Sequence, residues 1–170
     1  MLNIHIYGDS ILRVTPKPAA EFGEKLKTLG DEMLVTMREL EGVGLAANQI
    51  GKSIDMAVID VTGGEKTPFY LVNPKIIDAS EELVEEEEGC LSVPTIRLPV
   101  KRHKCVSVKA WDASGREYVI EKAEGLLARA LQHEIDHLNG ILFFDHVSHL
   151  QRQLISGKLK KLAKSGGEES

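Results

Sequence analysis

The sequence predicts an α+β fold built from antiparallel β-sheets and three helices. Two observations carry this prediction. Apolar residues recur at helical spacing in three separate segments, and four short apolar runs typical of strands lie between the first and second of these segments. A turn sequence from Asp112 to Gly115 joins the last two runs, so we expect neighbouring strands to pair antiparallel.

The first predicted helix spans Glu24 to Leu40. Charged residues separate its apolar positions, and Gly42 stands just beyond its end. The apolar positions are Leu26, Leu29, Met33, Met37 and Leu40. The next segment, residues 42–51, holds three glycines in ten residues, which indicates a loop or irregular edge where the backbone comes close to another group.

Four apolar runs are predicted to be strands of the antiparallel sheet. They cover residues 56–61, 69–72, 105–111 and 117–120. The turn of residues 112–115 would make a hairpin of the last two.

Two more helices are predicted after the strands. The second helix covers Gly125 to Leu138, and Gly140 is placed to end it. Its buried side would hold Leu127, Leu131, Ile135 and Leu138. Ser148 and Gln151 suggest the N-cap of a third helix. The apolar positions of that helix are Leu150, Leu154, Ile155, Leu159 and Leu162.

Length and composition exclude several classes of protein. A chain of 170 residues with 42% hydrophobic and 28% charged residues predicts one globular domain, here residues 1–164, with a disordered tail at 165–170. The net charge of -5 argues against specific DNA binding. Charged residues interrupt residues 1–14, so we expect neither a signal peptide nor a membrane span, and a cytoplasmic location. Two cysteines are too few for a disulfide-rich secreted scaffold.

Residues 133–137 read HEIDH, an HExxH run inside the second predicted helix. Successive helix residues turn by about 100°, so His133 and His137 project from one face and can bind the same cation. Glu134 stands beside that pair, where a carboxylate can take a proton from a water molecule that the cation activates. This spacing is typical of metal-dependent hydrolysis of amides.

The HExxH run leaves the third ligand open. The candidates are Cys90, Cys105, four other histidines and many acids, and Cys90 stands out because Gly89 and Pro94 hold its segment off regular helix. A metal ion lowers the pKa of a thiol enough to deprotonate it. Two imidazoles and one thiolate would leave a coordination position for water, which is typical of a catalytic site. Cys105, in a strand pattern, is expected to be a small buried residue.

Three segments, in this order, resemble the motifs of the peptide deformylase family: GVGLAANQ, EGCLSVP and QHEIDHLNG. The resemblance covers nearly the whole chain. It implies antiparallel β-sheets packed around a central helix that carries the HExxH run, with one helix N-terminal and one C-terminal to them. It also implies a hydrolase that removes the formyl group from the N-terminal formyl-methionine of newly synthesised polypeptides and releases formate.

Carried over position by position, the resemblance assigns the metal ligands as Cys90, His133 and His137. It makes Glu134 the general acid and base. The side-chain amide of Gln49 and the backbone N–H of Leu91 would donate to the formyl oxygen as it becomes an oxyanion. The resemblance implies one iron(II) ion per chain natively, and zinc, nickel or cobalt could replace it in purified protein.

The resemblance also implies an apolar pocket for the methionine side chain, beside a strand edge that pairs with the peptide backbone. The substrate-binding residues would be Val43, Gly44, Leu91, Leu126, Arg129, Ala130 and His133. Gly42 and Gly44 leave room for the peptide. Arg129 departs from the aliphatic residue of many relatives, and its guanidinium could lie across the pocket mouth on its methylene stem or point to solvent.

An acidic cluster precedes the cysteine motif and indicates a solvated loop or edge. It comprises Glu81, Glu82 and Glu85 to Glu88. Glu88 is the exception, since we expect it to pair with Arg97 or Arg102 and so hold the ligand segment. Asp136 could orient a ligand histidine or be a surface acid.

Two rival functions and one partner remain in view. A zinc endopeptidase would take its third ligand downstream of the helix, where His146 and His149 are the only histidines. A metal ion with a purely structural role would have no open coordination position.

Apart from the HExxH pair, the histidines are expected to be ordinary residues: His5, His103, His146 and His149. A basic flank on the last helix would solvate it or contact the ribosome; it comprises Lys158, Lys160, Lys161 and Lys164.

Overall fold

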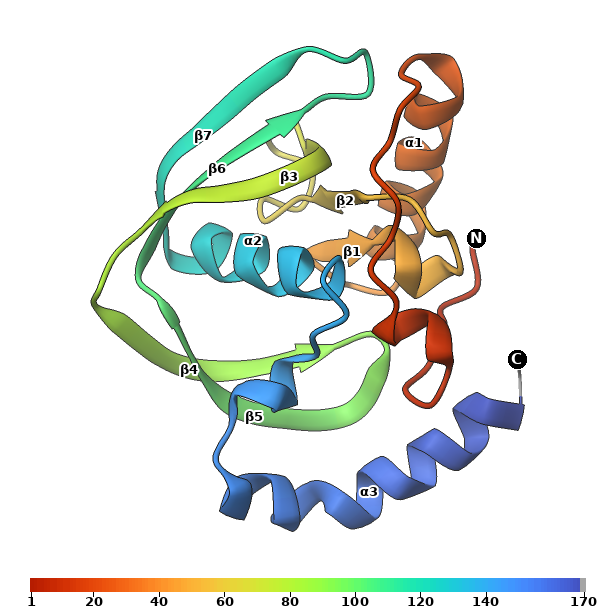
Figure 1. Cartoon of the computed structure of the whole chain (residues 1–170), viewed down its shortest axis with the longest axis vertical. Helices are drawn as coiled ribbons and strands as arrows, with labels where there is room; N and C mark the ends of the chain where they lie inside the picture. Colours follow the sequence, from red (N-terminus) through yellow and green to blue (C-terminus); the bar gives the residue numbers. More distant parts are fainter. Residues whose placement is uncertain (169–170) are drawn as a thin grey trace.

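The computed structural model describes residues 1–168, in two antiparallel sheets and three long helices (Figure 1). The helices are α1 (Glu24–Glu39), α2 (Gly125–His137) and α3 (His149–Glu168). The strands are β1 (Gly44–Ala46), β2 (Met56–Ile59), β3 (Phe69–Ala79), β4 (Leu83–Cys90), β5 (Val93–His103), β6 (Cys105–Trp111) and β7 (Glu117–Glu124). Short 3-10 helices cover Ser10–Arg13, Ala47–Ile50 and Phe143–His146. The α+β architecture predicted from the sequence is therefore confirmed.

Helix α2 lies between the two sheets (Figure 1). One sheet has five strands in the order β1-β2-β3-β6-β7, and the other is the β4–β5 hairpin. Ala128, Leu131 and Ile135 of α2 pack against the five-stranded sheet in one core cluster. The central helix with the HExxH run is thus enclosed on both sides, as expected.

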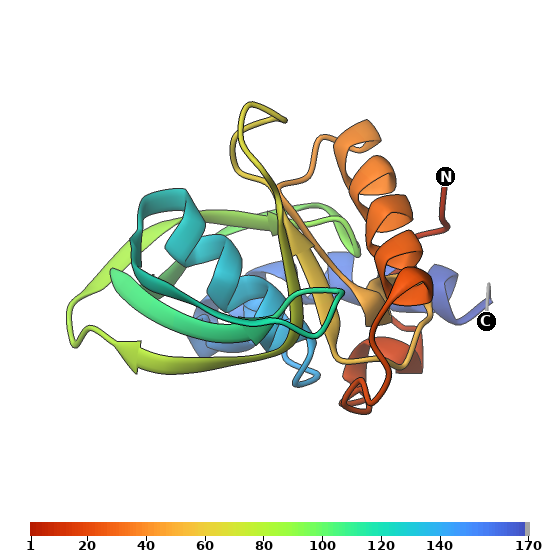
Figure 2. The same ribbon diagram turned by 90° about the horizontal axis from the view of Figure 1, so that it is seen from above.

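Helix α1 covers the opposite face of the five-stranded sheet (Figure 2). Its residues Leu26, Met33 and Met37 are buried there against β1 and β2, as the helical spacing predicted. Leu40 caps the helix and is 38% exposed, because the chain turns away after Glu39. A third core joins β5 to α3.

The hairpin of β6 and β7 is confirmed with its turn. The carboxylate of Asp112 accepts the backbone N–H groups of Ser114 and Arg116, and Gly115 has a φ of 88°, which favours glycine. Helix α3 also begins as predicted, since the hydroxyl of Ser148 accepts the N–H of Gln151 at 3.2 Å.

The β4–β5 hairpin is a correction. The acidic segment was expected to be a solvated loop or edge, and the loop is wrong, because the segment forms strand β4 and pairs with β5. Glu85, Glu86 and Glu87 stay exposed on this strand, as expected for a solvated edge. Much of β4 is exposed to solvent, so its backbone pairing does not require the apolar alternation that marks a buried strand. Strand β5 has that alternation in Ile96 and Leu98, but Pro94 and Pro99 argue against a strand in the sequence alone. Strand β1, inside the predicted irregular segment, is likewise an addition.

The end of the chain is a second correction. The folded domain was predicted to end at residue 164, but helix α3 continues to Glu168. Residues 169–170 lie outside the part of the chain that the structure describes. Gly166 lies so close to the N-terminal segment that a Cβ there would be 2.4 Å from the carbonyl oxygen of Tyr7. This tertiary contact orders the last turn of α3, and a polar terminal sequence gives no sign of it. No helix in the described residues is long and apolar enough to cross a membrane.

Candidate metal centre

Cys90, His133 and His137 come together in the structure from two elements. The two histidines lie one turn apart on α2, with ring centroids 4.9 Å apart, and both are buried. Cys90 ends β4 at the two-residue turn into β5, and its Sγ lies 3.2 Å from Nε2 of His137. One ligand atom from each of the three residues lies within 4.8 Å of the others. A thiolate and two imidazoles at this spacing fit a transition-metal ion.

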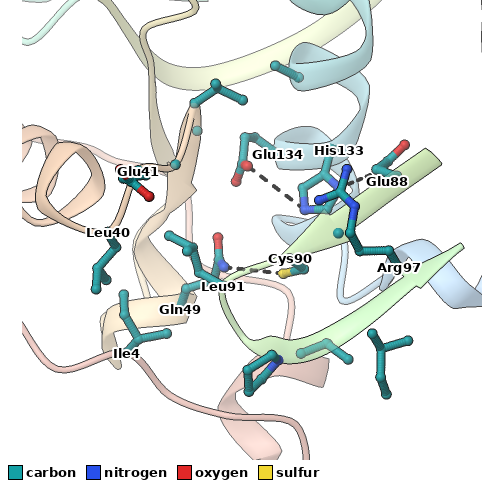
Figure 3. A pocket seen from close by; sticks show the side chains of 18 of the residues that line it. Ile4, Leu40, Glu41, Gln49, Glu88, Cys90, Leu91, Arg97, His133 and Glu134 are labelled. Atoms are coloured by element: carbon teal, nitrogen blue, oxygen red, sulfur yellow. Dashed lines mark hydrogen bonds and ion pairs between the residues drawn. The ribbon is translucent and has the colours of Figure 1, made fainter. Parts of the chain in front are cut away.

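His133 is oriented by a buried carboxylate. Its Nδ1 contacts Oε1 of Glu88, which leaves Nε2 to face the centre (Figure 3). Burial alone would raise the pKa of Glu88, but hydrogen bonds from His133 and Arg102 outweigh it and hold that pKa well below its usual range. Glu88 is therefore a charged acceptor beside the histidine.

Of the two alternatives predicted as the partner of Glu88, Arg97 or Arg102, the structure has Arg102. Its NH2 lies 2.6 Å from Oε1 and its Nε 3.1 Å from Oε2, a bidentate pair between buried residues. Arg97 is a correction: its side chain is 62% exposed, and its Nε lies 3.7 Å from Glu87. Arg97 alternates with the buried Ile96 and Leu98 on β5, so its side chain lies at the wall of the cavity and outside the buried group around Glu88.

The partly buried Asp136 and the buried Arg129 also belong to this group. Asp136 accepts from NH1 of Arg102 at 2.5 Å and contacts Nε2 of His146 at 2.7 Å, so it orients the arginine and contacts no candidate ligand histidine directly.

The guanidinium of Arg129 was expected to lie across the pocket mouth or to point to solvent, and this prediction is wrong. Its side chain is 8% exposed and its NH1 donates to Glu88 at 2.8 Å, because this buried carboxylate and two backbone carbonyl oxygens satisfy the donors of the guanidinium inside the protein.

Gln49 lies on the other side of the centre with its orientation fixed. Its Oε1 accepts the backbone N–H of Ala46 at 2.9 Å, so its amino group must face away from β1. That group donates to the Ser92 hydroxyl at 3.1 Å and approaches Sγ of Cys90 at 3.6 Å (Figure 3). Ser92 is fully buried and was not singled out in the sequence; its place two residues after Cys90 is the only signal for it.

Glu134 faces the same space. Its Oε1 lies 4.0 Å from Nε2 of His133, and its buried Oε2 has no hydrogen-bond partner among the described residues. Burial raises the pKa of Glu134 to about 7. A carboxyl group with such a pKa can both take and return a proton near neutral pH.

Asn48 supports His137 and was not predicted to do so. Its Nδ2 donates to the backbone carbonyl of His137 at 2.6 Å, at the end of α2. Nδ1 of His137 and Oδ1 of Asn48 are both buried with no hydrogen-bond partner in the part of the chain that the structure describes. An amide buried in the 3-10 helix after β1 has no distinctive pattern in the sequence.

The centre opens into a cavity of about 950 Å³. All seven residues expected at the substrate pocket line it: Val43, Gly44, Leu91, Leu126, Arg129, Ala130 and His133. The sequence did not indicate that residues 1–4 and Leu40 also line this cavity. Two of the three candidate ligands, Cys90 and His133, thus lie at the wall of an open space, and His137 is buried beside them.

Comparison with known proteins agrees with this arrangement. The family model of polypeptide deformylase matches residues 1–153. The chain belongs to this family. A peptide deformylase of Rhizobium meliloti is 44% identical over 97% of this chain and 95% of that protein, and one of Mesorhizobium japonicum is 47% identical over 94% and 91%.

Solved deformylase structures share the fold. Arabidopsis thaliana peptide deformylase 1B superposes with a TM-score of 0.94 and 39% identity, covering 99% of this chain and 94% of that one. The Thermus thermophilus deformylase gives a TM-score of 0.90 and 38% identity, covering 98% and 99%. As a polypeptide deformylase, the chain belongs to a family of metal-dependent hydrolases. The ligand set supports this against the endopeptidase alternative, because the third candidate ligand, Cys90, lies upstream of the helix.

Proposed function

We propose that the chain is a single metallohydrolase domain that removes the formyl group from the N-terminal formyl-methionine of newly synthesised polypeptides and releases formate. The observation that carries this proposal is the convergence of Cys90, His133 and His137 beside Glu134, in a group that opens into a large cavity through Cys90, His133 and Glu134. Membership of the polypeptide deformylase family supports it.

Cys90, His133 and His137 would hold one metal ion, iron(II) natively, with zinc, nickel or cobalt able to replace it. When bound, such an ion polarises a carbonyl group and lowers the pKa of water. The donor set fits this role, because a softer thiolate combined with two imidazoles suits these metals better than magnesium or calcium.

Glu134 would move the proton. Its carboxylate takes a proton from the water that attacks the formyl carbon, a C–O bond forms, and the C–N bond of the formamide then breaks. The same carboxyl group gives its proton to the leaving amine, so the products are formate and a free N-terminus. The pKa of about 7 that burial confers on Glu134 suits both halves of this exchange.

Gln49 and Leu91 would stabilise the negative charge that develops on the formyl oxygen. The amino group of Gln49 already points to the centre, held by Ala46 on one side and Ser92 on the other. Leu91 follows Cys90 in the turn, where its backbone N–H can donate to the same oxygen. A donor that is fixed in advance needs no reorganisation during the reaction, and losing one costs about 3–4 kcal/mol of transition-state stabilisation.

The substrate would bind as an extended chain. Among the residues that the structure describes, strand β1 pairs with β2 alone, so its second edge is available to the peptide backbone beside the cavity. The methionine side chain would enter between Val43, Leu126 and Ala130, against the ring of His133. Backbone pairing recognises an extended peptide irrespective of its sequence, which suits an enzyme that acts on many nascent chains.

A contact of α3 with the ribosome would bring the enzyme to its substrate in the cytoplasm. Leu150 and Leu154 are 67% and 77% exposed on this helix. The helix also carries an exposed basic flank: Lys158, Lys160, Lys161 and Lys164. Co-sedimentation with ribosomes should weaken with rising salt and be lost when these four lysines become glutamine.

Formate release tests the function directly. Protein reconstituted anaerobically with iron(II) should release formate from formyl-Met-Ala, and Glu134→Gln should lose nearly all of this activity while it retains the metal. No formate from fully loaded wild-type protein would refute the proposal. An acetylated dipeptide and an unmodified longer peptide serve as controls, and internal cleavage of the latter would instead favour the endopeptidase alternative.

A further inference from the structure

Arg129 occupies an unexpected position for a charged residue. It lies on the second turn of α2, four residues before His133, so the two side chains project from one face of the helix. Only 8% of its side chain is exposed, although it lines the cavity. A buried guanidinium must satisfy its hydrogen bonds and its charge within the protein.

All the groups that satisfy the hydrogen bonds and the charge of this guanidinium belong to the β4–β5 hairpin. NH1 donates to the carbonyl oxygen of Val100 at 2.9 Å, and NH2 donates to that of Val84 at 2.8 Å. NH1 also donates to Oε2 of Glu88 at 2.8 Å, and Nε lies 3.5 Å from the exposed carboxylate of Glu86. Arg129 therefore fastens α2 to both strands of the hairpin.

Glu88 connects this arginine to the metal centre. Its Oε2 accepts from Arg129 and its Oε1 contacts Nδ1 of His133, so the carboxylate spans two side chains one helical turn apart. A rotation of Glu88 would therefore tilt the ring of His133. Nε2 of His133 faces the other candidate ligands, so this tilt would turn the metal-binding atom away from the centre.

Arg102 alone cannot hold Glu88 as firmly, because it is shared. Its NH1 lies 2.5 Å from Asp136 while Nε and NH2 bond Glu88. Without Arg129, the carboxylates of Glu88 and Asp136 would share the single buried guanidinium of Arg102, which would leave an excess of negative charge. Arg129 supplies a second buried guanidinium to Glu88, at 2.8 Å.

We propose that Arg129 is a positioning residue of the metal centre, which acts through Glu88 to hold His133 in its metal-binding orientation. This inference rests on the proposed function only in taking Cys90, His133 and His137 as the ligands. It concerns metal retention, which is measurable without substrate.

The test is the rate at which zinc-loaded protein releases its ion to a chromogenic chelator. Arg129→Met keeps the apolar stem and removes every donor, and it should release zinc about 10-fold or more faster than the wild type. Arg129→Lys keeps the charge without the planar fork and should fall between them. The matched control is Arg13→Met, because Arg13 also joins a carboxylate and a carbonyl, those of Asp145 and Gly140. It should lower stability and leave zinc release unchanged well below the unfolding temperature.

A double-mutant cycle separates positioning from general loosening. Glu88→Gln should itself speed zinc release, and adding Arg129→Met to it should have little further effect if Arg129 acts through Glu88. Additive effects in the cycle, or wild-type zinc release by folded Arg129→Met, would overturn the inference. If Arg129→Met does not fold, the comparison of Arg129→Lys with the wild type in both Glu88 backgrounds decides the same question. Absence of deformylation by the wild type would instead refute the proposed function alone.

Discussion

Gly44 of β1 and Glu134 of α2 lie directly against each other at the wall of the cavity. A Cβ atom added to Gly44 would lie 2.6 Å from Oε1 of Glu134 and 2.8 Å from its Cγ. The glycine is therefore required by the carboxylate that the proposed mechanism uses to move a proton, rather than by a turn.

Gly44→Ala should displace Glu134 and lower kcat/KM by about 10- to 100-fold, since misplacing a catalytic group by about 1 Å has an effect of this size. Formate release gives the rate, and metal content should be unchanged because the ligands are not touched. Gly157→Ala is the control, because nothing lies within 4 Å of a Cβ there. Equal activity in Gly44→Ala and wild type would show that Glu134 does not need its present position.

Ser92→Ala should lower kcat by about 10-fold and leave KM nearly unchanged. The Ser92 hydroxyl accepts from Gln49 at 3.1 Å, and without it the amide is free to rotate away from the formyl oxygen. Steady-state kinetics with formyl-Met-Ala measure both constants. A rise in KM at constant kcat would mean that Ser92 acts in substrate binding instead.

Asp55→Asn should stabilise the protein at neutral pH. Burial raises the pKa of Asp55 from 3.8 to about 6, so between these values the folded state binds a proton that the unfolded state has lost. The unfolding free energy of the wild type therefore falls as pH rises through this window. The advantage of Asp55→Asn should grow from near zero at pH 4 to about 1–2 kcal/mol at pH 7.

Urea unfolding of both proteins at pH 4, 5.5 and 7 measures this difference. Contributions of the metal centre to the pH dependence are common to both proteins and cancel. An advantage that is the same at all three pH values would contradict the raised pKa.

Met33→Ala should cost roughly 2–5 kcal/mol of unfolding free energy, because a fully buried side chain leaves a cavity. Met33 lies on the side of α1 that packs against the sheet, and it is 0% exposed. Val35→Ala on the same helix is the matched control: its side chain is 52% exposed, and we expect a change within about 0.5 kcal/mol. Chemical unfolding measures both, and similar losses in the two variants would exclude the proposed orientation of α1.

Local sequence patterns predicted much of the fold. The helical spacing of Leu26, Met33 and Met37 placed α1, and the turn at residues 112–115 placed the β6–β7 hairpin. The β4–β5 hairpin was missed because its pairing satisfies backbone groups without an apolar pattern in β4, and because prolines interrupt β5.

The sequence by itself determined which side chains could bind a metal ion, since the spacing of His133 and His137 places both on one face of any helix. It also determined the family, through three ordered motifs. Only the tertiary structure decided that Glu88 pairs with Arg102 and Arg129 and not with Arg97. These partners lie 14 and 41 positions away along the chain. Long-range pairs of this kind depend on how strands and helices pack, which no local pattern specifies.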